Sequence, residues 1–427
     1  MAGADEVSTV IGKGLEQGSI TEDEIRAFTE QALSQCNLRD KRVLVIIPDL
    51  TRNAPIPVFF RLLFELLGDQ VKNLDYLIAL GTHQPMDEEQ ICERVGVSQR
   101  ELHQKYEKVK FFNHAHDKPE ALVTIGTIPE HEIDDISNHL LKEEVEVTLN
   151  KMILDYDFLI IMSPVVPHEV AGFSGGNKYL FPGIAGECII HCFHWLSALI
   201  TNSVINGTKQ NPVRKLLDRA ASLLEVPRIC FCMVVHEKKL SGLFIGSVEE
   251  AWSHAADLSQ ILHIQYFEKP FHTVLGVAPL YYDDIWVAGK VMYKLESVVA
   301  DGGELIIYAP HITKISHTHG EILHRIGYHV GDYYLKQMDK FGDIPRCVLA
   351  HSTHVRGIGT FENGIEKPRI KVTLATGIAP ETCERINLSC RDAETIDFSE
   401  WKGREKEGIL FVENAGEVLY RLKTDTS

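Results

Sequence analysis

The chain has 427 residues, of which 44% are hydrophobic and 24% are charged. This length and balance predict a globular protein of two or three domains and exclude a disordered or fibrous chain. The 43 basic and 60 acidic residues give a net charge of −17, which argues against nucleic acid and against an anionic membrane as main partners. Histidine stands out in the composition, with 20 residues against only 4 tryptophans.

The sequence predicts a cytoplasmic protein. Residues 1–6 lack the basic and apolar segments of a signal peptide, and the longest apolar runs, such as residues 158–166, are far shorter than the roughly 20 residues of a membrane span. The nine cysteines are scattered and contain no C-x-x-C pair. A disulfide framework or a structural zinc site is therefore not expected.

Apolar runs alternate with amphipathic segments along the first 265 residues. Strands are predicted at residues 42–47, 74–80, 109–113, 121–127, 145–150 and 157–166. Helices are predicted at residues 57–67, 87–94, 212–225 and 248–262. This order is typical of a mostly parallel sheet that is covered on both faces.

The pattern restarts after a boundary near residues 266–270. Strands are predicted at residues 273–277, 304–308, 346–350 and 371–375, helices at residues 284–299 and 379–386, and a turn at Gly302-Gly303. We therefore expect two Rossmann-like α/β domains, residues 1–268 and 271–405, with mostly parallel sheets and an active-site cleft between them. Whether the tail, residues 406–427, packs back on the first domain stays open.

Residues 167–186, PHEVAGFSGGNKYLFPGIAG, contain five glycines and directly follow a buried strand. Ligands bind beyond the carboxyl ends of strands in open α/β sheets, and glycine there permits positive φ and close backbone approach. His168, Ser174 and Lys178 supply reactive groups in this segment. A Walker A pattern is absent. The alternative is a glycine-rich connection that carries a solvated lysine.

Polar residues also follow the two preceding strands. Asp49 and Arg52 come after the strand at residues 42–47, and His83 comes after the strand at residues 74–80. The planar guanidinium of arginine suits a carboxylate or a phosphate, whereas an aspartate at such a place is often a helix N-cap. Together with residues 167–186, these side chains predict one site at one edge of the sheet.

Two further groups of histidines have more than one interpretation. His191 and His194 would share a face of a helix at residues 187–196, either as metal ligands or as core residues. Later histidines are expected in surface turns, with the pair 317 and 319 alternatively facing the cleft: His311, His317, His319, His351 and His354.

Three motifs together resemble the nickel-pincer lactate racemase family: D-L-T-R-N-A-P at residues 49–55, G-T-H at residues 81–83, and the long segment at residues 167–186. The resemblance covers most of residues 40–200. The family carries a histidine sixteen residues after the lysine of the long motif, and in this chain that residue is His194.

The resemblance implies a role for each matching residue. Lys178 would hold a pyridinium-3,5-bisthiocarboxylic acid mononucleotide covalently, and His194 would ligate the nickel of this nickel-pincer nucleotide. His83 and His168 would be the catalytic acid/base pair. The remaining expected contacts are to the cofactor from Asp49, Ser174, Gly175 and Gly176, and to the substrate from Arg52, Trp286 and Lys290.

The implied activity is a racemase or epimerase that inverts C2 of a small anionic 2-hydroxy acid by hydride transfer, with a 2-keto acid as intermediate. Accessory enzymes that build the cofactor would be partners. Val287 stands where the family has a glutamine, so a substrate other than lactate is expected: a malate-like diacid, a sugar acid, or an aliphatic or aromatic 2-hydroxy acid. Lys290 could instead be a solvated helix lysine.

Two other functions stay open. The same cofactor with an external electron acceptor would make the chain a 2-hydroxy-acid dehydrogenase. The third hypothesis is a protein that binds a metal or a nucleotide without catalysing a reaction. The pair His83 and His168 argues against it, because a binding protein needs no acid/base pair. The sequence does not indicate an oligomeric state.

Overall fold

The computed structural model describes residues 9–423 and divides into two compact α/β units. Within this range, unit 1 comprises the residues up to Val166, Phe173–Ile190 and Pro212–Leu262. Unit 2 comprises Pro167–Gly172, His191–Asn211 and the residues from His263 onward. The last change of unit lies close to the boundary expected at residues 266–270, but the sequence patterns did not indicate the two short segments that leave the first unit. Residues 1–6, considered above for a signal peptide, lie outside the described range.

Unit 1 is built on a seven-stranded sheet of order β1-β11-β10-β7-β2-β3-β4. Its strands are β1 (Ile11–Gly14), β2 (Arg42–Pro48), β3 (Asn73–Ala79), β4 (Phe111–Asn113), β7 (Phe158–Pro164), β10 (Arg228–His236) and β11 (Lys239–Gly246). The strands from β10 to β4 run parallel, whereas β11 pairs antiparallel with both β10 and β1. The expected α/β class with a mostly parallel sheet is confirmed.

Two strands of unit 1 lie outside this sheet. The segments β5 (Leu122–Ile128) and β6 (Val145–Asn150) were expected to be extended, and they pair only with each other, antiparallel. The sequence did not predict β1, β10 or β11.

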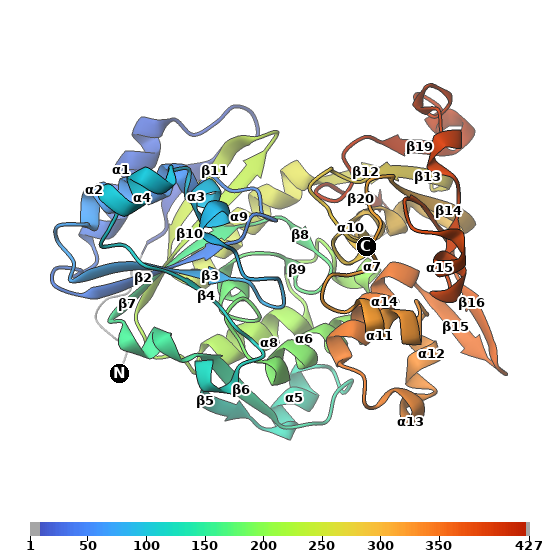
Figure 1. The fold of residues 1–427 in the computed structure, drawn as a ribbon, viewed down its shortest axis with the longest axis horizontal. Coiled ribbons are helices and arrows are strands. Elements are labelled where there is room, and N and C mark those ends of the chain that lie inside the picture. Colours follow the sequence, from blue (N-terminus) through green and yellow to red (C-terminus); the bar gives the residue numbers. More distant parts are fainter. Residues whose placement is uncertain (1–8, 424–427) are drawn as a thin grey trace. The chain divides into compact units, whose positions relative to one another are not determined.

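Four helices cover one face of the seven-stranded sheet (Figure 1). They are α1 (Glu22–Ser34), α2 (Ile56–Leu67), α3 (Glu88–Val95) and α4 (Gln99–Gln104). Capping boxes start α1, α3 and α4, in which the N-cap side chain and the third helical residue satisfy each other's backbone N–H groups. Phe59 and Phe60 of α2 belong to the same core as the β2 side chains of Val43 and Val45. The remaining longer helices of the chain's first part are α5 (Glu130–Ile136), α6 (Glu187–Ile200), α8 (Pro212–Ala221) and α9 (Val248–His263).

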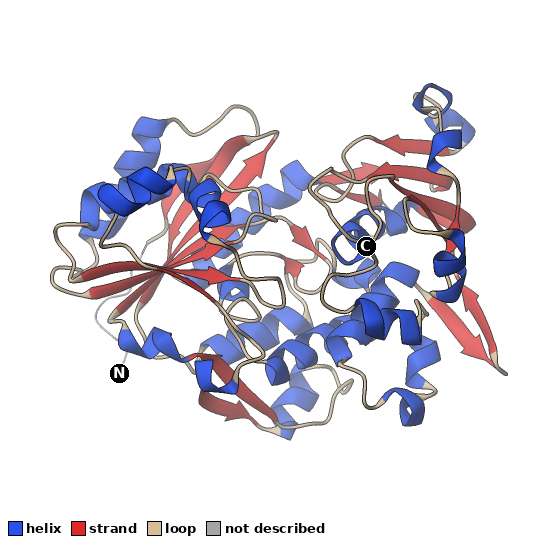
Figure 2. Cartoon of the chain, viewed as in Figure 1, coloured by secondary structure: helices blue, strands red, loops and turns tan. Residues whose placement is uncertain are grey.

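Unit 2 is built on a five-stranded parallel sheet of order β18-β17-β14-β13-β19. The strands are β13 (Phe271–Val277), β14 (Val299–Ala309), β17 (Lys371–Thr376), β18 (Ser389–Cys390) and β19 (Ile409–Val412). Its helices include α10 (Ile285–Leu295), α11 (Gly320–Ile326), α12 (Gly331–Leu335), α14 (Arg346–Arg356) and α15 (Pro380–Arg385). A hairpin of β15 (Gly359–Glu362) and β16 (Ile365–Pro368) extends beyond the helices of its unit (Figure 2).

The tail belongs to unit 2 rather than to the first domain. β19 joins the five-stranded sheet beside β13, and β20 (Leu419–Leu422) pairs in parallel with β12 (Ile264–Phe267). No helix within residues 9–423 is both long and apolar enough to span a bilayer.

Two predicted elements are wrong. Residues 346–350 were expected to form a strand, but they open the helix α14, which starts after Pro345 and ends before Gly357. A short apolar run does not distinguish a buried strand from a helix that is buried on all sides, and almost every residue of α14 is buried. His351 and His354 therefore lie in a core helix and not in surface turns. The expected turn at Gly302-Gly303 is also wrong, because β14 runs through it.

Candidate functional site

In unit 1 the predicted site residues follow the carboxyl ends of three adjacent parallel strands. β7, β2 and β3 are neighbours in the sheet, so their carboxyl ends meet at one edge. Asp49 follows β2 directly, and His83 follows β3 after a short turn. The glycine-rich segment after β7 reaches the same edge, because the backbone N–H of Gly81 donates to the carbonyl of Gly183 over 2.9 Å.

Asp49 and His83 form a close pair. Oδ2 of Asp49 lies 2.5 Å from Nδ1 of His83, and Oδ1 accepts from the hydroxyl and the backbone N–H of Thr51 at 2.6 and 3.0 Å. Burial alone would raise the pKa of Asp49, but the charge and hydrogen bond of His83, with Arg52 and Thr51, lower it well below its usual range. An ionised carboxylate at Nδ1 assigns the imidazole proton to that nitrogen and leaves Nε2 of neutral His83 as an acceptor.

The turn that carries Asp49 is held by an arginine that sequence reasoning missed. Arg94 of α3 is 6% exposed and donates to the carbonyl groups of Asp49, Arg52 and Ala54, at 3.2, 2.9 and 2.6 Å. Asp49 is not a helix N-cap, because Pro55 precedes the first residue of α2. Three carbonyls on one guanidinium explain how a turn without regular structure can hold a buried carboxylate in place.

In the glycine-rich segment, the predicted cofactor contacts make internal bonds. Ser174 Oγ donates to the carbonyl of Pro164 and accepts from the N–H of Val166, at 2.9 and 3.0 Å. Gly175 and Gly176 have φ of 83° and 60°, and a Cβ on Gly175 would lie 2.6 Å from the Val165 side chain. Glycine is thus required at both positions by backbone conformation, and at Gly175 also by space.

Lys178 lies in a short 3₁₀ turn, Gly176–Tyr179, and is half-buried. Burial raises the pKa of the neighbouring Tyr179 phenol well above its usual value, and the charges that act on it include those of Arg52, Asp49 and Arg94. Tyr179 therefore joins the lysine turn to the turn that carries Asp49. Within unit 1 the structure brings together Asp49, His83, Arg52 and the segment of Lys178.

A second arginine missed from sequence supports the lysine segment. Arg214 of α8 is 2% exposed and donates to the carbonyls of Phe173 and, at 3.2 Å, Gly175. Its guanidinium lies 4.0 Å from the Trp252 ring centroid, a cation–π geometry. Burial lowers the pKa of Arg214 to about 10, which leaves it charged at neutral pH.

In unit 2, His168 has the opposite tautomer to His83. Its Nδ1 accepts the backbone N–H of Val170 at 3.1 Å, so the neutral imidazole carries its proton on Nε2. The residue is 8% exposed. Its segment is held by Lys294 of α10, a buried lysine whose Nζ donates to the carbonyl of Pro167, and by the N–H of Gly207, which donates to the carbonyl of Gly172 at 2.9 Å.

His194 lies on α6 next to a cluster of histidines in unit 2. Ser197 Oγ donates to the His194 carbonyl at 2.6 Å, so it must accept from Nε2 of His354 at 3.0 Å. Burial lowers the pKa of His354 to about 4. Burial also lowers the pKa of His351 well below its usual value, with further lowering from His354, His319 and His194. These neighbours place the four imidazoles in one cluster.

Trp286 and Lys290 of α10 belong to the same unit. The Trp286 ring stacks on His351 at 4.0 Å between centroids and lies 4.6 Å from the His319 ring. Both nitrogens of His351 face tyrosine hydroxyls, that of Tyr293 at 2.8 Å and that of Tyr328 at 3.3 Å. Lys290 Nζ lies 4.9 Å from the ring centroid of Tyr282.

The donor set can be compared with the group that the resemblance implies. That group would need an amine for attachment and an imidazole for nickel; Lys178 of unit 1 carries an amine, and His194 of unit 2 carries an imidazole. Among residues 9–423, the one group of three side chains that could hold a metal by itself is Asp283, Asp284 and His317, which does not include His194. The residues present fit a cofactor that brings most of its own nickel ligands.

Sequence comparisons identify relatives of the chain. The family model of a lactate racemase N-terminal domain matches residues 16–206. The chain is 26% identical over 307 residues to the lactate racemase of Thermoanaerobacterium thermosaccharolyticum, covering 67% of this chain and 65% of that protein. It is 25% identical over 283 residues to the lactate racemase of Lactiplantibacillus plantarum, covering 62% and 59%. Both matches span less than two thirds of the relative's length.

Solved structures extend the similarity to the whole chain. A crystal structure of a protein from Thermotoga maritima superposes with a TM-score of 0.88 at 33% identity, over 96% of this chain and all of that chain. The lactate racemase apoprotein of Thermoanaerobacterium thermosaccharolyticum superposes with a TM-score of 0.69 at 20% identity, over 99% and 96% of the two chains. The second match shows a shared fold.

Proposed function

The chain belongs to the lactate racemase family, and from this premise we propose that it is a racemase or epimerase that inverts C2 of a small anionic 2-hydroxy acid. The observation that carries the proposal is the contact of 2.5 Å between Asp49 and His83 at the carboxyl edge of the sheet. A carboxylate that fixes the tautomer of a half-exposed imidazole is the arrangement of a general base.

The two predicted acid/base histidines suit opposite halves of an inversion. Inverting a carbinol carbon through a planar 2-keto acid requires one group that takes the hydroxyl proton and another that returns a proton. His83, with its proton held at Nδ1 by Asp49, offers Nε2 as the base. His168 would act as the acid in its imidazolium form, in which Nδ1–H faces the Glu169 carboxylate at 3.4 Å and the Nε2 proton passes to the substrate oxygen, leaving a neutral imidazole. In the reverse direction the roles exchange, and proton exchange with solvent restores both imidazoles.

For the cofactor we propose Lys178 as the covalent attachment point and His194 as the protein ligand to nickel. When bound, the nickel-pincer nucleotide would supply a hydride acceptor, which avoids a carbanion at a C–H bond too weakly acidic for a side-chain base. The protein's own part is to position the substrate carboxylate and the reacting carbon. Arg52 beside Asp49 and Lys290 on α10 provide the positive charges for this.

The substrate is proposed to differ from lactate. Val287 cannot make the amide hydrogen bonds of a glutamine, and the neighbouring Trp286 is packed between His319 and His351. These contacts build an aromatic and imidazole-rich wall that suits a larger or more hydroxylated 2-hydroxy acid than lactate.

The central test is mass spectrometry of protein produced together with the enzymes that build the cofactor. We expect a nucleotide-sized adduct on the peptide of Lys178, one nickel per chain by elemental analysis, and loss of both in K178A. The matched control is Lys215→Arg, an exposed lysine change in the same unit, which should keep adduct and nickel. An unmodified Lys178 without nickel under these conditions would overturn the cofactor proposal.

The reaction is tested with a panel of single enantiomers of malate-like, sugar-acid, aliphatic and aromatic 2-hydroxy acids in D₂O. A hydride that moves as a unit does not exchange with solvent, so the inverted product should keep protium at C2. Deuterium at C2 would indicate proton abstraction instead. Keto acid that accumulates in step with reduction of an added electron acceptor would identify a dehydrogenase.

A further inference from the structure

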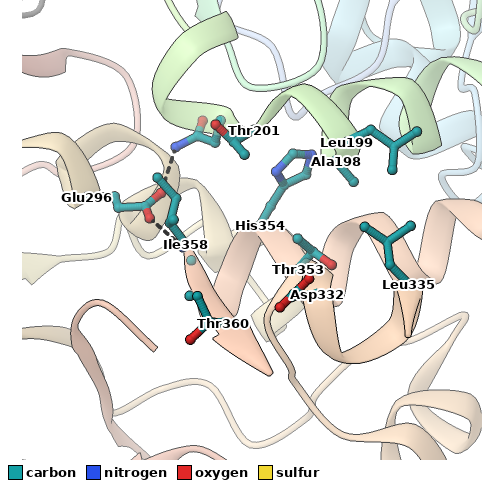
Figure 3. Close-up of a pocket in the computed structure, with 14 residues that line it drawn as sticks. Ala198, Leu199, Thr201, Glu296, Asp332, Leu335, Thr353, His354, Ile358 and Thr360 are labelled. Atoms are coloured by element: carbon teal, nitrogen blue, oxygen red, sulfur yellow. Dashed lines mark hydrogen bonds between the residues drawn. The ribbon is translucent and has the colours of Figure 1, made fainter. Parts of the chain in front are cut away.

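Unit 2 contains a cavity of about 280 Å³ that is lined in part by His354 of the histidine cluster (Figure 3). It is bounded by the end of α6, by α12 and α14, and by residues 357–360. Its volume is close to the lower end of ligand pockets, about 300 Å³, which suits a small molecule rather than a nucleotide or a peptide.

Polar side chains line much of this cavity. Hydroxyls come from Thr201, Thr353 and Thr360, an amide from Asn202, and carboxyl groups from Glu296 and Asp332. None of the fourteen described residues that line it is a lysine or an arginine. An anionic ligand would therefore meet two carboxyl groups and no opposing charge.

Thr353 has unused hydrogen-bonding capacity at this place. The residue is 7% exposed, and its Oγ1 is buried without a hydrogen-bond partner among the described residues. Buried hydroxyls in native proteins are nearly always hydrogen-bonded, because leaving one unpaired costs free energy. In Figure 3, Thr353 lies at the wall of the cavity, beside Asp332 and across from Thr201.

The carboxyl groups of the cavity do not require a cation. Glu296 accepts from the N–H of Ile358 at 3.0 Å and from Asn202 Nδ2 at 3.2 Å. Asp332 accepts from Lys336 Nζ and from the N–H of Phe361, both at 2.8 Å. Each group is thus partly satisfied by the protein, with lone pairs left over for further donors.

We propose that this cavity binds a small neutral polyhydroxylated molecule, a polyol or a monosaccharide. Hydroxyl groups both donate and accept, so they match the threonine hydroxyls, and they donate to the remaining carboxyl oxygens. Ala198 and Leu199 of α6 and Leu335 of α12 give the apolar surface against which the carbon skeleton would lie. None of the lining residues is proposed to contact the substrate or the cofactor of the racemase reaction, although His354 also belongs to the histidine cluster of unit 2.

The test is isothermal titration calorimetry of the full chain with xylitol, sorbitol and glucose as probes, and with putrescine as a cationic comparison. We expect saturable binding of at least one neutral probe. Thr353→Val removes the hydroxyl at nearly constant volume and should weaken that binding by about three- to tenfold, as for the loss of one hydrogen bond. Ala198→Leu fills the cavity and should abolish binding.

Two further variants keep the result interpretable. Thr360→Val lies on the exposed rim, where a folding defect is not expected, and should also weaken binding. Thr313→Val is the matched control, an exposed threonine of the same unit outside the cavity, and should bind as the unchanged chain does. The proposal would be overturned by the absence of saturable heat with every neutral probe at tens of millimolar, or by binding of putrescine alone. It would also be overturned if Thr353→Val and Thr360→Val both bound as tightly as the unchanged chain. Binding of putrescine alone would indicate a cation site.

Discussion

Oδ2 of Asp49 lies 2.5 Å from Nδ1 of His83, although 34 residues separate them. The pairing follows from topology, because β2 and β3 are adjacent parallel strands and both residues come just after the carboxyl ends. The carboxylate sets the tautomer, and the tautomer decides which imidazole nitrogen can act on a substrate.

Replacing Asp49 by asparagine should leave the fold intact and remove the charge that holds the proton on Nδ1. We expect turnover of the physiological substrate to fall by about 10²–10⁴, the range typical of losing a carboxylate that orients a catalytic histidine. Nitrogen-15 NMR of labelled histidine should show a larger share of the Nε2–H tautomer for His83.

The control for this prediction is Asp75→Asn, which also replaces a buried carboxylate of unit 1 but lies within β3, away from His83. Asp75 Oδ2 accepts from the Tyr156 hydroxyl at 2.9 Å, so the change should affect stability and leave the tautomer of His83 as it was. Full activity in D49N would remove the general-base role from this pair.

Replacing Arg94 by methionine should loosen the turn at Asp49. Three carbonyls lose their donor, and since hydrogen bonds from a charged group are worth about 1.5–3 kcal/mol each before relaxation, the free energy of unfolding should fall by roughly 2–4 kcal/mol. Urea unfolding measures this change. The same substitution at the exposed Arg100 of α4 should cost less than about 0.5 kcal/mol. Equal effects at both arginines would show that the carbonyl contacts contribute little.

Replacing His351 by alanine should release Trp286. The ring loses a stacking partner at 4.0 Å, and the vacated core space should lower the free energy of unfolding by about 2–4 kcal/mol. We expect the tryptophan emission to shift to longer wavelength, a change that should be absent when Trp286 is already phenylalanine. In activity assays the KM should rise more than kcat falls, since Trp286 is proposed to contact substrate. His351→Phe keeps an aromatic partner and should restore most of the emission.

Much of the candidate site could be predicted from the sequence because its residues follow buried apolar strands. The runs at residues 42–47 and 157–166 indicate central strands, and parallel topology then places Asp49, His83 and the segment of Lys178 at one edge. The prediction of a strand at residues 346–350 was wrong because it also depended on a short apolar run. The same run of apolar residues occurs in a helix that is buried on all sides.

The supporting residues could not be predicted in this way. Arg94, Arg214 and Lys294 each lie on a helix, and in a sequence they look like the charged face of an amphipathic helix. Their partners are backbone carbonyls of distant loops, which leave no pattern of residue types. One weak sequence signal could have indicated these supporting residues: a basic residue that has apolar neighbours at helical spacing. Such a pattern suggests a cation that is buried and must therefore be paired.

The buried histidines predict how stability depends on pH. Burial lowers the pKa values of His114 and His354 to about 4, and it lowers the pKa of His351 well below its usual value. In the unfolded chain these groups titrate near 6.5, so between about pH 6.5 and pH 4 the unfolded state binds more protons than the native state. The free energy of unfolding should therefore decrease as the pH falls through this window, by up to about 3 kcal/mol for each such histidine. Asp49, whose native pKa is lowered, should add a separate loss only below about pH 4.

His114 allows this prediction to be tested away from the proposed reaction. Its Nε2–H donates to the carbonyl of Ala185 at 2.9 Å, and its Nδ1 accepts from Asn150 at 3.2 Å, so both nitrogens are used only by the neutral form. Glutamine at this position cannot ionise, and H114Q should lose less stability between pH 7.5 and pH 5 than the unchanged chain in urea unfolding. The same change at the exposed His131 should leave the pH dependence as it was. If H114Q and H131Q show equal slopes, His114 is not a source of the acid sensitivity.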